Sequence, residues 1–145
     1  MGLEFLALKK RDFGRIDVNL GETLLVYDTQ NIFAKIIRGE IPCEKVYEGK
    51  HVLAFHDIAP QAPVHILVIP KGQYISLNDF SQKASDEEAS ELIRVVGKLS
   101  RDFNIVESGY RILANHGKNA HQEVPHFHVH LLGGRDLGGI ISYGG

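Results

Sequence analysis

Hydrophobic residues recur at helical spacing in two segments of the chain. In the first segment, four apolar side chains lie on one stripe of a helix. Asp28 or Thr29 can cap the start of this helix, and Gly39 can end it. The pattern predicts a short helix over residues 29–38.

The second helical segment has the clearest pattern in the chain. Ser85 and Glu88 have the spacing of a capping box, in which the two side chains bond each other's backbone N–H groups. The apolar residues that follow share one face and are Ala89, Leu92, Ile93, Val96, Leu99 and Phe103. A helix from residue 86 to about 103 is predicted.

Five other segments are rich in β-branched and aromatic residues, as strands are. They are residues 44–47, 52–56, 64–69, 110–114 and 124–132. Glu48-Gly49-Lys50 fits a hairpin turn between the first two, and Pro60 to Pro63 excludes regular structure before the third. Hairpins without regular strand–helix–strand alternation predict an α+β fold, with about five strands in an antiparallel sheet and two helices.

The composition is that of one globular domain. The 145 residues leave no room for a second core, and 43% apolar residues are too many for a disordered chain. A net charge of −2 gives no broad basic field, so we expect no nucleic-acid partner. Cys43 is the single cysteine, and no apolar run approaches the roughly 20 residues that span a bilayer. We therefore expect a cytoplasmic protein with no membrane partner.

Residues 1–25 form an N-terminal extension of uncertain order, ahead of a domain formed by residues 26–145. The start resembles a signal peptide only in part, because Glu4 stands where positive charge belongs and Lys9 ends a short apolar stretch. We expect deletion of residues 1–25 to leave folding and activity intact.

Three histidines, His126, His128 and His130, alternate with apolar residues. Successive side chains of a strand point to opposite faces, so the three imidazoles share one face, roughly 6.5 to 7 Å apart by twice the strand rise. An unperturbed imidazole pKa near 6.5 lets such a row offer a neutral nucleophile beside a protonated donor. That pair suits phosphoryl or nucleotidyl transfer without a metal.

Two other interpretations of the row stay open. One is the polar face of a half-buried strand that happens to carry histidine. The other is a metal site completed by His116 or His121, although three side chains on a flat strand fan outward and converge on one ion only with strong curvature. We expect no metal and no cofactor.

The row also carries a family resemblance. His126-Phe127-His128-Val129-His130-Leu131-Leu132, followed by Gly133-Gly134-Arg135, resembles the signature of the histidine triad (HIT) superfamily. Further segments resemble its branch of histidine triad nucleotide-binding proteins, of the bacterial type. These are Asn31 to Ile37, Glu40-Ile41-Pro42, Ala54 to His65, Leu67 to Lys71 and Arg135 to Gly139. The resemblance covers about residues 27–142.

This resemblance implies a HIT-like fold, a homodimer and a metal-independent hydrolase. The implied reaction cleaves purine nucleoside phosphoramidates or acyl-adenylates to the nucleoside monophosphate through a nucleotidyl-histidine. By motif position, His128 is the nucleophile, His130 contacts the phosphate and aids the leaving group, and His126 orients the row. His65 matches a fourth histidine beside the nucleophile.

The resemblance also implies a nucleotide pocket. Asp57 matches a carboxylate that accepts both ribose hydroxyls, while its sequence context alone fits an Asx turn. The residues that match the purine pocket are Ile32, Phe33, Ile36, Phe55, Ile58 and Leu67, all of which the apolar pattern alone assigns to the core. Asn115, Gln122 and Glu123 match positions around the phosphate and the leaving group.

Two departures from the family leave the rate and the preferred leaving group open. Ala120-His121 replaces a common Gly-Gly pair, and Glu123 stands where animal members carry Ser. Two other functions compete with the phosphoramidase: a dinucleoside polyphosphate hydrolase of the sister branch, and a non-catalytic nucleotide-binding regulatory module.

Overall fold

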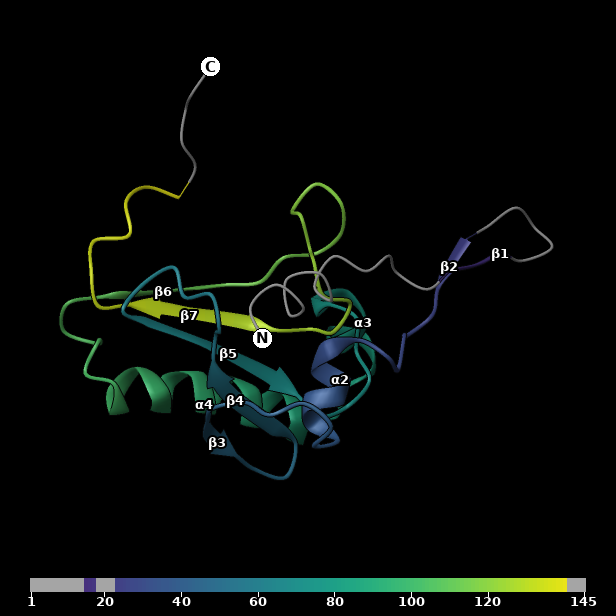
Figure 1. The fold of residues 1–145 in the computed structure, drawn as a ribbon, viewed down its shortest axis with the longest axis horizontal. Coiled ribbons are helices and arrows are strands. Elements are labelled where there is room, and N and C mark those ends of the chain that lie inside the picture. The colour runs from purple at the N-terminus through teal and green to yellow at the C-terminus, as the bar shows by residue number, and fades with distance from the viewer. Residues whose placement is uncertain (1–14, 18–22, 141–145) are drawn as a thin grey trace, which may run out of the picture.

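The structure is a computed structural model that describes residues 15–17 and 23–140 (Figure 1). Two short strands, β1 (Arg15–Asp17) and β2 (Thr23–Leu25), pair antiparallel within the predicted extension. The other residues of the 1–25 segment lie outside the described residues. The remaining elements form one sheet with helices packed on both of its faces.

The main sheet has five strands, all paired antiparallel, as predicted. The strands are β3 (Lys45–Glu48), β4 (Val52–His56), β5 (Val64–Pro70), β6 (Tyr110–Leu113) and β7 (Val129–Gly133). Their order across the sheet is β3-β4-β5-β7-β6. The first four lie within one residue of the bounds predicted from the sequence, so the α+β architecture is confirmed.

The last strand is shorter than the predicted range of 124–132. It begins at Val129, because Pro125 has no N–H for a ladder and the N–H of Phe127 donates to the carbonyl of Tyr74, which lies outside the strands. The alternation nevertheless continues through this segment. Phe127 and Val129 pack into the core on one side of the sheet, and His128 between them lies on the other.

The predicted first helix is α2 (Ile32–Ile37), shorter than the expected 29–38. Its N-cap is Asn31, whose side chain accepts from the N–H of Ala34. The carboxylate of Asp28 instead accepts from the N–H of Gln30 in a turn before the helix. Gly39 follows the C-terminus with φ +79, in the left-handed region that favours glycine.

The second predicted helix is α4 (Asp86–Asp102), with the Ser85–Glu88 capping box in place. Its buried face differs from the predicted stripe, because Val95 and Ser100 are buried, whereas Ala89 is exposed, Ile93 is 65% exposed and Phe103 is half-buried. A third helix, α3 (Leu77–Lys83), was not predicted. It has only one buried residue, Phe80, so the apolar pattern gives no signal, although the Ser76–Asp79 capping box marks its start.

Two hydrophobic clusters fill the two faces of the sheet. Residues of α4 pack with alternate residues of β4, β5 and β7, including Ile66 and Leu131, on one face. Residues of α2 pack with Phe55 and Leu67, from the other set of alternate positions, on the opposite face. Figure 1 shows α4 running along the strands and α2 near the carboxyl end of β5. Within the described residues, no helix is long and apolar enough to cross a membrane.

Candidate active site

Four histidines come together on the face of the sheet that α2 covers. His65 lies on β5, where its strand pairs with β7, and His130 lies on β7. The ring centroids of His65 and His130 are 5.2 Å apart, and those of His128 and His130 are 5.0 Å apart. The second spacing is shorter than the roughly 6.5 to 7 Å expected from twice the strand rise. The expectation that the triad shares one face is confirmed.

His126 is completely buried and carries its ring proton on Nε2. This nitrogen lies 2.8 Å from the carbonyl oxygen of Pro70, which can only accept, so Nε2 donates. Nδ1 therefore holds the lone pair and accepts from the Tyr27 hydroxyl at 2.5 Å. Burial lowers the pKa of His126 to about 4, so the ring is neutral near pH 7.

His128 has the opposite tautomer. Its Nδ1 lies 2.6 Å from the main-chain carbonyl oxygen of His126, so Nδ1 donates and the lone pair of the neutral ring lies on Nε2. The ring of Phe33, on α2, meets the His128 ring edge to face with centroids 5.0 Å apart. The hydrogen bond and the aromatic contact both help to orient this imidazole.

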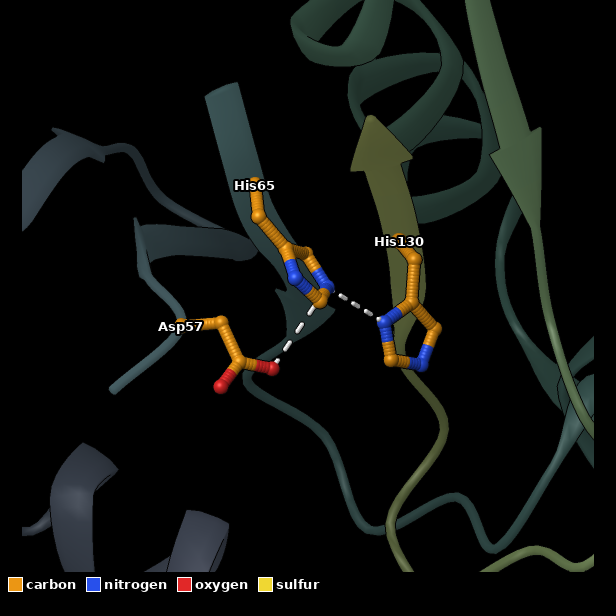
Figure 2. A group of neighbouring side chains, drawn as sticks. All are labelled: Asp57, His65 and His130. Atoms are coloured by element: carbon orange, nitrogen blue, oxygen red, sulfur yellow. Dashed lines mark hydrogen bonds and ion pairs between the residues drawn. The ribbon is translucent and has the colours of Figure 1, made fainter. Parts of the chain in front are cut away.

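A hydrogen bond from His65 determines the tautomer of His130. The backbone N–H of Gln61 donates to Nδ1 of His65 at 3.0 Å, so the His65 proton is on Nε2. That Nε2 lies 2.9 Å from Nδ1 of His130, which accepts and leaves the His130 proton on Nε2. Figure 2 shows this second nitrogen of His130 directed away from His65.

The imidazoles of His128 and His130 therefore differ at Nε2, where one has a lone pair and the other a proton. His128 has a lone pair on Nε2, and His130 has a proton on Nε2. A lone pair beside an N–H donor can attack an electrophilic centre while the N–H stabilises the departing group through a hydrogen bond. A backbone carbonyl fixes the tautomer of His128, and His65, itself bonded to the N–H of Gln61, fixes that of His130, so the arrangement needs no ligand.

Asp57 follows β4 and lies beside these histidines, as Figure 2 shows. It is 6% exposed, and its Oδ1 accepts from the N–H of Ala59, which is the Asx turn anticipated from the sequence. Its Oδ2 lies 3.5 Å from Nε2 of His65. The carboxylate thus has a structural role in the turn and a position within the site.

Among the described residues, ligand-type atoms of Asp57, His65 and His130 lie within 4.8 Å of one another, close enough to surround one metal ion. The group differs from the set with His116 or His121 considered from the sequence; His116 instead bonds the Ser76 hydroxyl. The hydrogen bond from Gln61 places a proton on Nε2 of His65, so this nitrogen is a donor and not a metal ligand in the observed tautomer. The donor set therefore does not fit a resident metal.

Two cavities meet at Asp57. One, of about 340 Å³, is lined by three of these histidines, and the other, of about 510 Å³, is mainly apolar and extends toward the end of α2. The smaller is lined by Phe33, Asp57, Ala59, Gln61, His65, Leu67, Asn115, Ala120, His121, Glu123, Val124, His128 and His130. The larger is lined by Ile36, Pro42, Cys43, Glu44, Phe55, His56, Asp57, Ile58 and Pro60.

Most of the predicted pocket residues line one of these cavities. Exceptions are Ile32 and Gln122, which line neither. Ile32 is buried in the cluster beneath α2. The amide of Gln122 donates to the carbonyls of Ile75 and Val124 and accepts from the N–H of Gly117, so this side chain braces the loop before β7.

The two departures from the family pattern, Ala120-His121 and Glu123, lie in the loop that Gln122 braces, and they line the smaller cavity. His121 has φ +55, a left-handed conformation that is uncommon for residues other than glycine. Its exposed ring and Glu123 line the cavity beside the histidine row. The backbone geometry explains why a glycine fits this position, and the ring adds a polar group to the cavity wall.

Three partners of the histidines were not identified from the sequence: the Tyr27 hydroxyl, the N–H of Gln61 and the carbonyl of Pro70. The backbone groups give no sequence signal. Tyr27 precedes the predicted helix by a few residues, and nothing in the hydrophobic pattern connects it with a histidine 99 positions away.

Comparisons with known proteins agree with this geometry. Residues 38–137 match the family described as "HIT domain". A purine nucleoside phosphoramidase of Escherichia coli K12 is 46% identical over 117 residues, 80% of this chain and 97% of that protein. An uncharacterised 13.2 kDa HIT-like protein of Azospirillum brasilense is 57% identical over 118 residues, 81% of this chain and 97% of that protein.

The fold is also shared with a solved structure. A histidine triad protein from Clostridium difficile superposes with a TM-score of 0.68 at 42% identity, covering 76% of this chain and 95% of the other. The chain, with its three alternating histidines on one face of a five-stranded antiparallel sheet, belongs to the HIT domain family.

Proposed function

We propose that this HIT protein is a purine nucleoside phosphoramidase, a hydrolase that cleaves the P–N bond of AMP conjugates and related acyl-adenylates. The observation that carries the proposal is the pair of opposite tautomers, with a lone pair on His128 and a proton on His130 at the same ring position. The relative from Escherichia coli that bears the name purine nucleoside phosphoramidase, at 46% identity, supports it.

The first step is attack of Nε2 of His128 on phosphorus. The new P–N bond forms as the bond to the leaving group breaks, and the leaving nitrogen, protonated from solvent, departs as the neutral amine. The Nε2–H of His130 donates a hydrogen bond to the lone pair that develops on this nitrogen. The phosphorylated His128 ring gains a positive charge, which the carbonyl of His126 stabilises through the Nδ1–H bond. The product of this step is a nucleotidyl-histidine.

Water completes the reaction in a second step. Its oxygen attacks phosphorus, its proton passes to solvent, and the bond from phosphorus to Nε2 of His128 breaks, which releases the nucleoside monophosphate and restores the lone pair of His128. His65 holds Nδ1 of His130 as an acceptor in both steps, because its own Nδ1 stays bonded to the N–H of Gln61. No step needs a metal or another cofactor.

The two cavities accommodate the parts of the nucleotide. The mainly apolar cavity suits the purine, with Ile36, Phe55 and Ile58 in its walls, while Ile32, Phe33 and Leu67 support it from the core. Asp57, where the cavities meet, accepts the ribose hydroxyls. Around the phosphate and the leaving group lie Asn115 and Glu123, with Gln122 fixing their loop.

We further propose that the domain of residues 26–145 functions as a cytoplasmic homodimer. β6 is an edge strand, and it exposes Tyr110, Ile112 and Leu113 at 42%, 48% and 36%. Ile93 of α4 and Val106 add further exposed apolar surface. An open edge with apolar side chains favours strand pairing with a second copy.

A substrate panel tests the phosphoramidase. The purified protein is assayed with a fluorogenic adenosine phosphoramidate and with diadenosine tetraphosphate, each with and without EDTA. We expect phosphoramidate turnover that survives EDTA and exceeds tetraphosphate cleavage. A preference for the tetraphosphate would assign the sister hydrolase activity, and AMP binding without any turnover would assign the regulatory module. Activity lost on chelation and restored by metal would overturn the metal-free mechanism.

A further inference from the structure

Tyr27 reaches the row of histidines from outside the matched HIT domain, residues 38–137. Its hydroxyl lies 2.5 Å from Nδ1 of His126, and the two rings meet edge to face with centroids 5.6 Å apart. The proposed reaction assigns this side chain no role. Its hydrogen bond to the completely buried His126 nevertheless connects the segment before α2 with the row of histidines.

The segment that carries His126 and His128 is not held by the ladder of the sheet, because β7 begins only at Val129. Three hydrogen bonds to other segments are among the contacts that anchor it. The N–H of Phe127 donates to the carbonyl of Tyr74 at 2.7 Å, His126 donates to the carbonyl of Pro70 at 2.8 Å, and Tyr27 donates to His126. Two of the three therefore act through the His126 side chain.

The main chain of the same residue sets the tautomer of the nucleophile. The carbonyl of His126 accepts the Nδ1–H of His128 at 2.6 Å, so movement of His126 changes the hydrogen bond that keeps the lone pair on Nε2. Phe33 contacts both rings, with centroids 6.3 Å from His126 and 5.0 Å from His128. A turn of the His126 ring would therefore disturb the packing of His128 as well.

We propose that Tyr27 is a positioning residue for the nucleophile. Its hydroxyl fixes the ring of His126, and His126 in turn holds the His128 tautomer through its carbonyl. The inference rests on the proposed function for the role of His128, and on the observed contacts for everything else.

The hydroxyl suits this task because the His126 ring has no solvent to bond. Without a donor, Nδ1 would be a buried lone pair with no partner, and turning the ring to bring its N–H elsewhere would break the bond to Pro70. Burial raises the pKa of Tyr27, so the hydroxyl keeps its proton throughout the neutral range. Phenylalanine would preserve the ring contact and remove only the donor.

Tyr27→Phe in the full-length chain tests the inference, with Tyr47→Phe as the matched control on strand β3. The kinetic readout is kcat and KM for a nucleoside phosphoramidate. We expect kcat to fall about 10-fold in Tyr27→Phe while KM stays within about twofold, as for a misaligned reacting group. Tyr47→Phe should keep the wild-type kcat, since Tyr47 lies away from the histidines.

The second readout does not depend on activity. In protein labelled with ¹⁵N-histidine, the Nδ1–H of His128 should give a slowly exchanging proton signal, which Tyr27→Phe should broaden or lose while the protein remains cooperatively folded. Unchanged kcat, or a lower kcat with the His128 signal intact, would overturn the inference. Absence of wild-type turnover would refute the proposed function alone, and the proton signal would still decide whether Tyr27 positions His128.

Discussion

The two faces of the central sheet are both buried, but one is covered by a long helix and the other only partly, by a short helix. On one face the 17-residue helix α4 covers β4, β5 and β7 with buried aliphatic and aromatic side chains. On the other face the six-residue helix α2 covers only part of the same strands. The histidines, Asp57 and both cavities of the site lie on the side of α2.

Alternation along each strand produces this division. On β5, Ile66 and Val68 pack toward α4, while His65 and Leu67 face α2 and the smaller cavity. The face with the long helix gains its stability from apolar burial. The face with the short helix leaves room for a ligand and keeps its polar groups bonded to backbone atoms. The comparison therefore predicts that changes on the two faces affect stability and catalysis differently.

The largest expected effect is on the catalytic face. His128→Ala should abolish phosphoramidate turnover, by roughly 10⁴-fold or more, because it removes the nucleophile and with it the covalent route. AMP affinity should remain, since the purine and ribose contacts do not involve His128. His130→Ala should cost on the order of 10² to 10⁴ in rate, with a smaller loss for good leaving groups. Steady-state kinetics and AMP titration check both; near-normal turnover of His128→Ala contradicts the assignment.

A matched pair of core truncations separates the two faces directly. Leu99 and Leu67 are each 1% exposed, and replacing either with Ala should lower the free energy of unfolding by about 2 to 5 kcal/mol. Leu99→Ala, on the α4 face, should leave kcat within about twofold, whereas Leu67→Ala should also impair turnover because Leu67 lines the cavity with the histidines. Urea unfolding and kinetics well below the midpoint test this. Equal kcat values in the two variants would break the comparison.

Acid should destabilise the catalytic face through His126. Burial lowers the pKa of His126 to about 4 in the folded state, against about 6.5 when unfolded. The stabilisation is therefore complete above pH 6.5 and is lost as the pH falls toward 4, by about 3 kcal/mol in total. Urea unfolding at several pH values should show this slope in the wild type and a smaller slope in His126→Asn. Identical slopes would contradict a lowered pKa, because they would mean that His126 binds protons equally in the folded and the unfolded protein.

A smaller effect is expected for the carboxylate between the cavities. Asp57→Asn keeps an oxygen for the turn with Ala59 and removes the charge, so AMP binding should weaken by about 1.5 to 3 kcal/mol, the range for a charged hydrogen-bond acceptor. Asp57→Ala should weaken binding at least as much. Calorimetry with AMP and deoxy-AMP measures the loss and the preference for ribose. An unchanged preference for ribose in Asp57→Asn would mean that Asp57 acts only in the turn and does not bind the ribose hydroxyls.

The features set by local periodicity could be predicted from the sequence. The five strands, the capping box of α4 and the shared face of the three histidines all follow from periods of 2 and 3.6 residues and from local side-chain chemistry. The start of β7 was placed too early because the histidine alternation continues through Pro125, where the ladder does not.

The chemistry of the site depends on contacts that the sequence does not show. The tautomers of His126 and His130 depend on Pro70, Tyr27 and His65, which are 56, 99 and 65 positions away from their partners. Their alignment requires the folded sheet and the segment before α2. The nucleotide pocket was likewise predicted only through the family resemblance, because its residues have the ordinary apolar character of a core.

The stereochemical course at phosphorus tests the central claim most directly, namely that His128 forms a covalent nucleotidyl intermediate. A nucleoside phosphoramidate made chiral at phosphorus is hydrolysed in a single turnover in oxygen-labelled water, and the configuration of the monophosphate is determined. Attack by His128 followed by attack of water comprises two inversions, so the account predicts net retention. Inversion would mean that water attacks phosphorus directly and would contradict the assignment of His128 as the nucleophile.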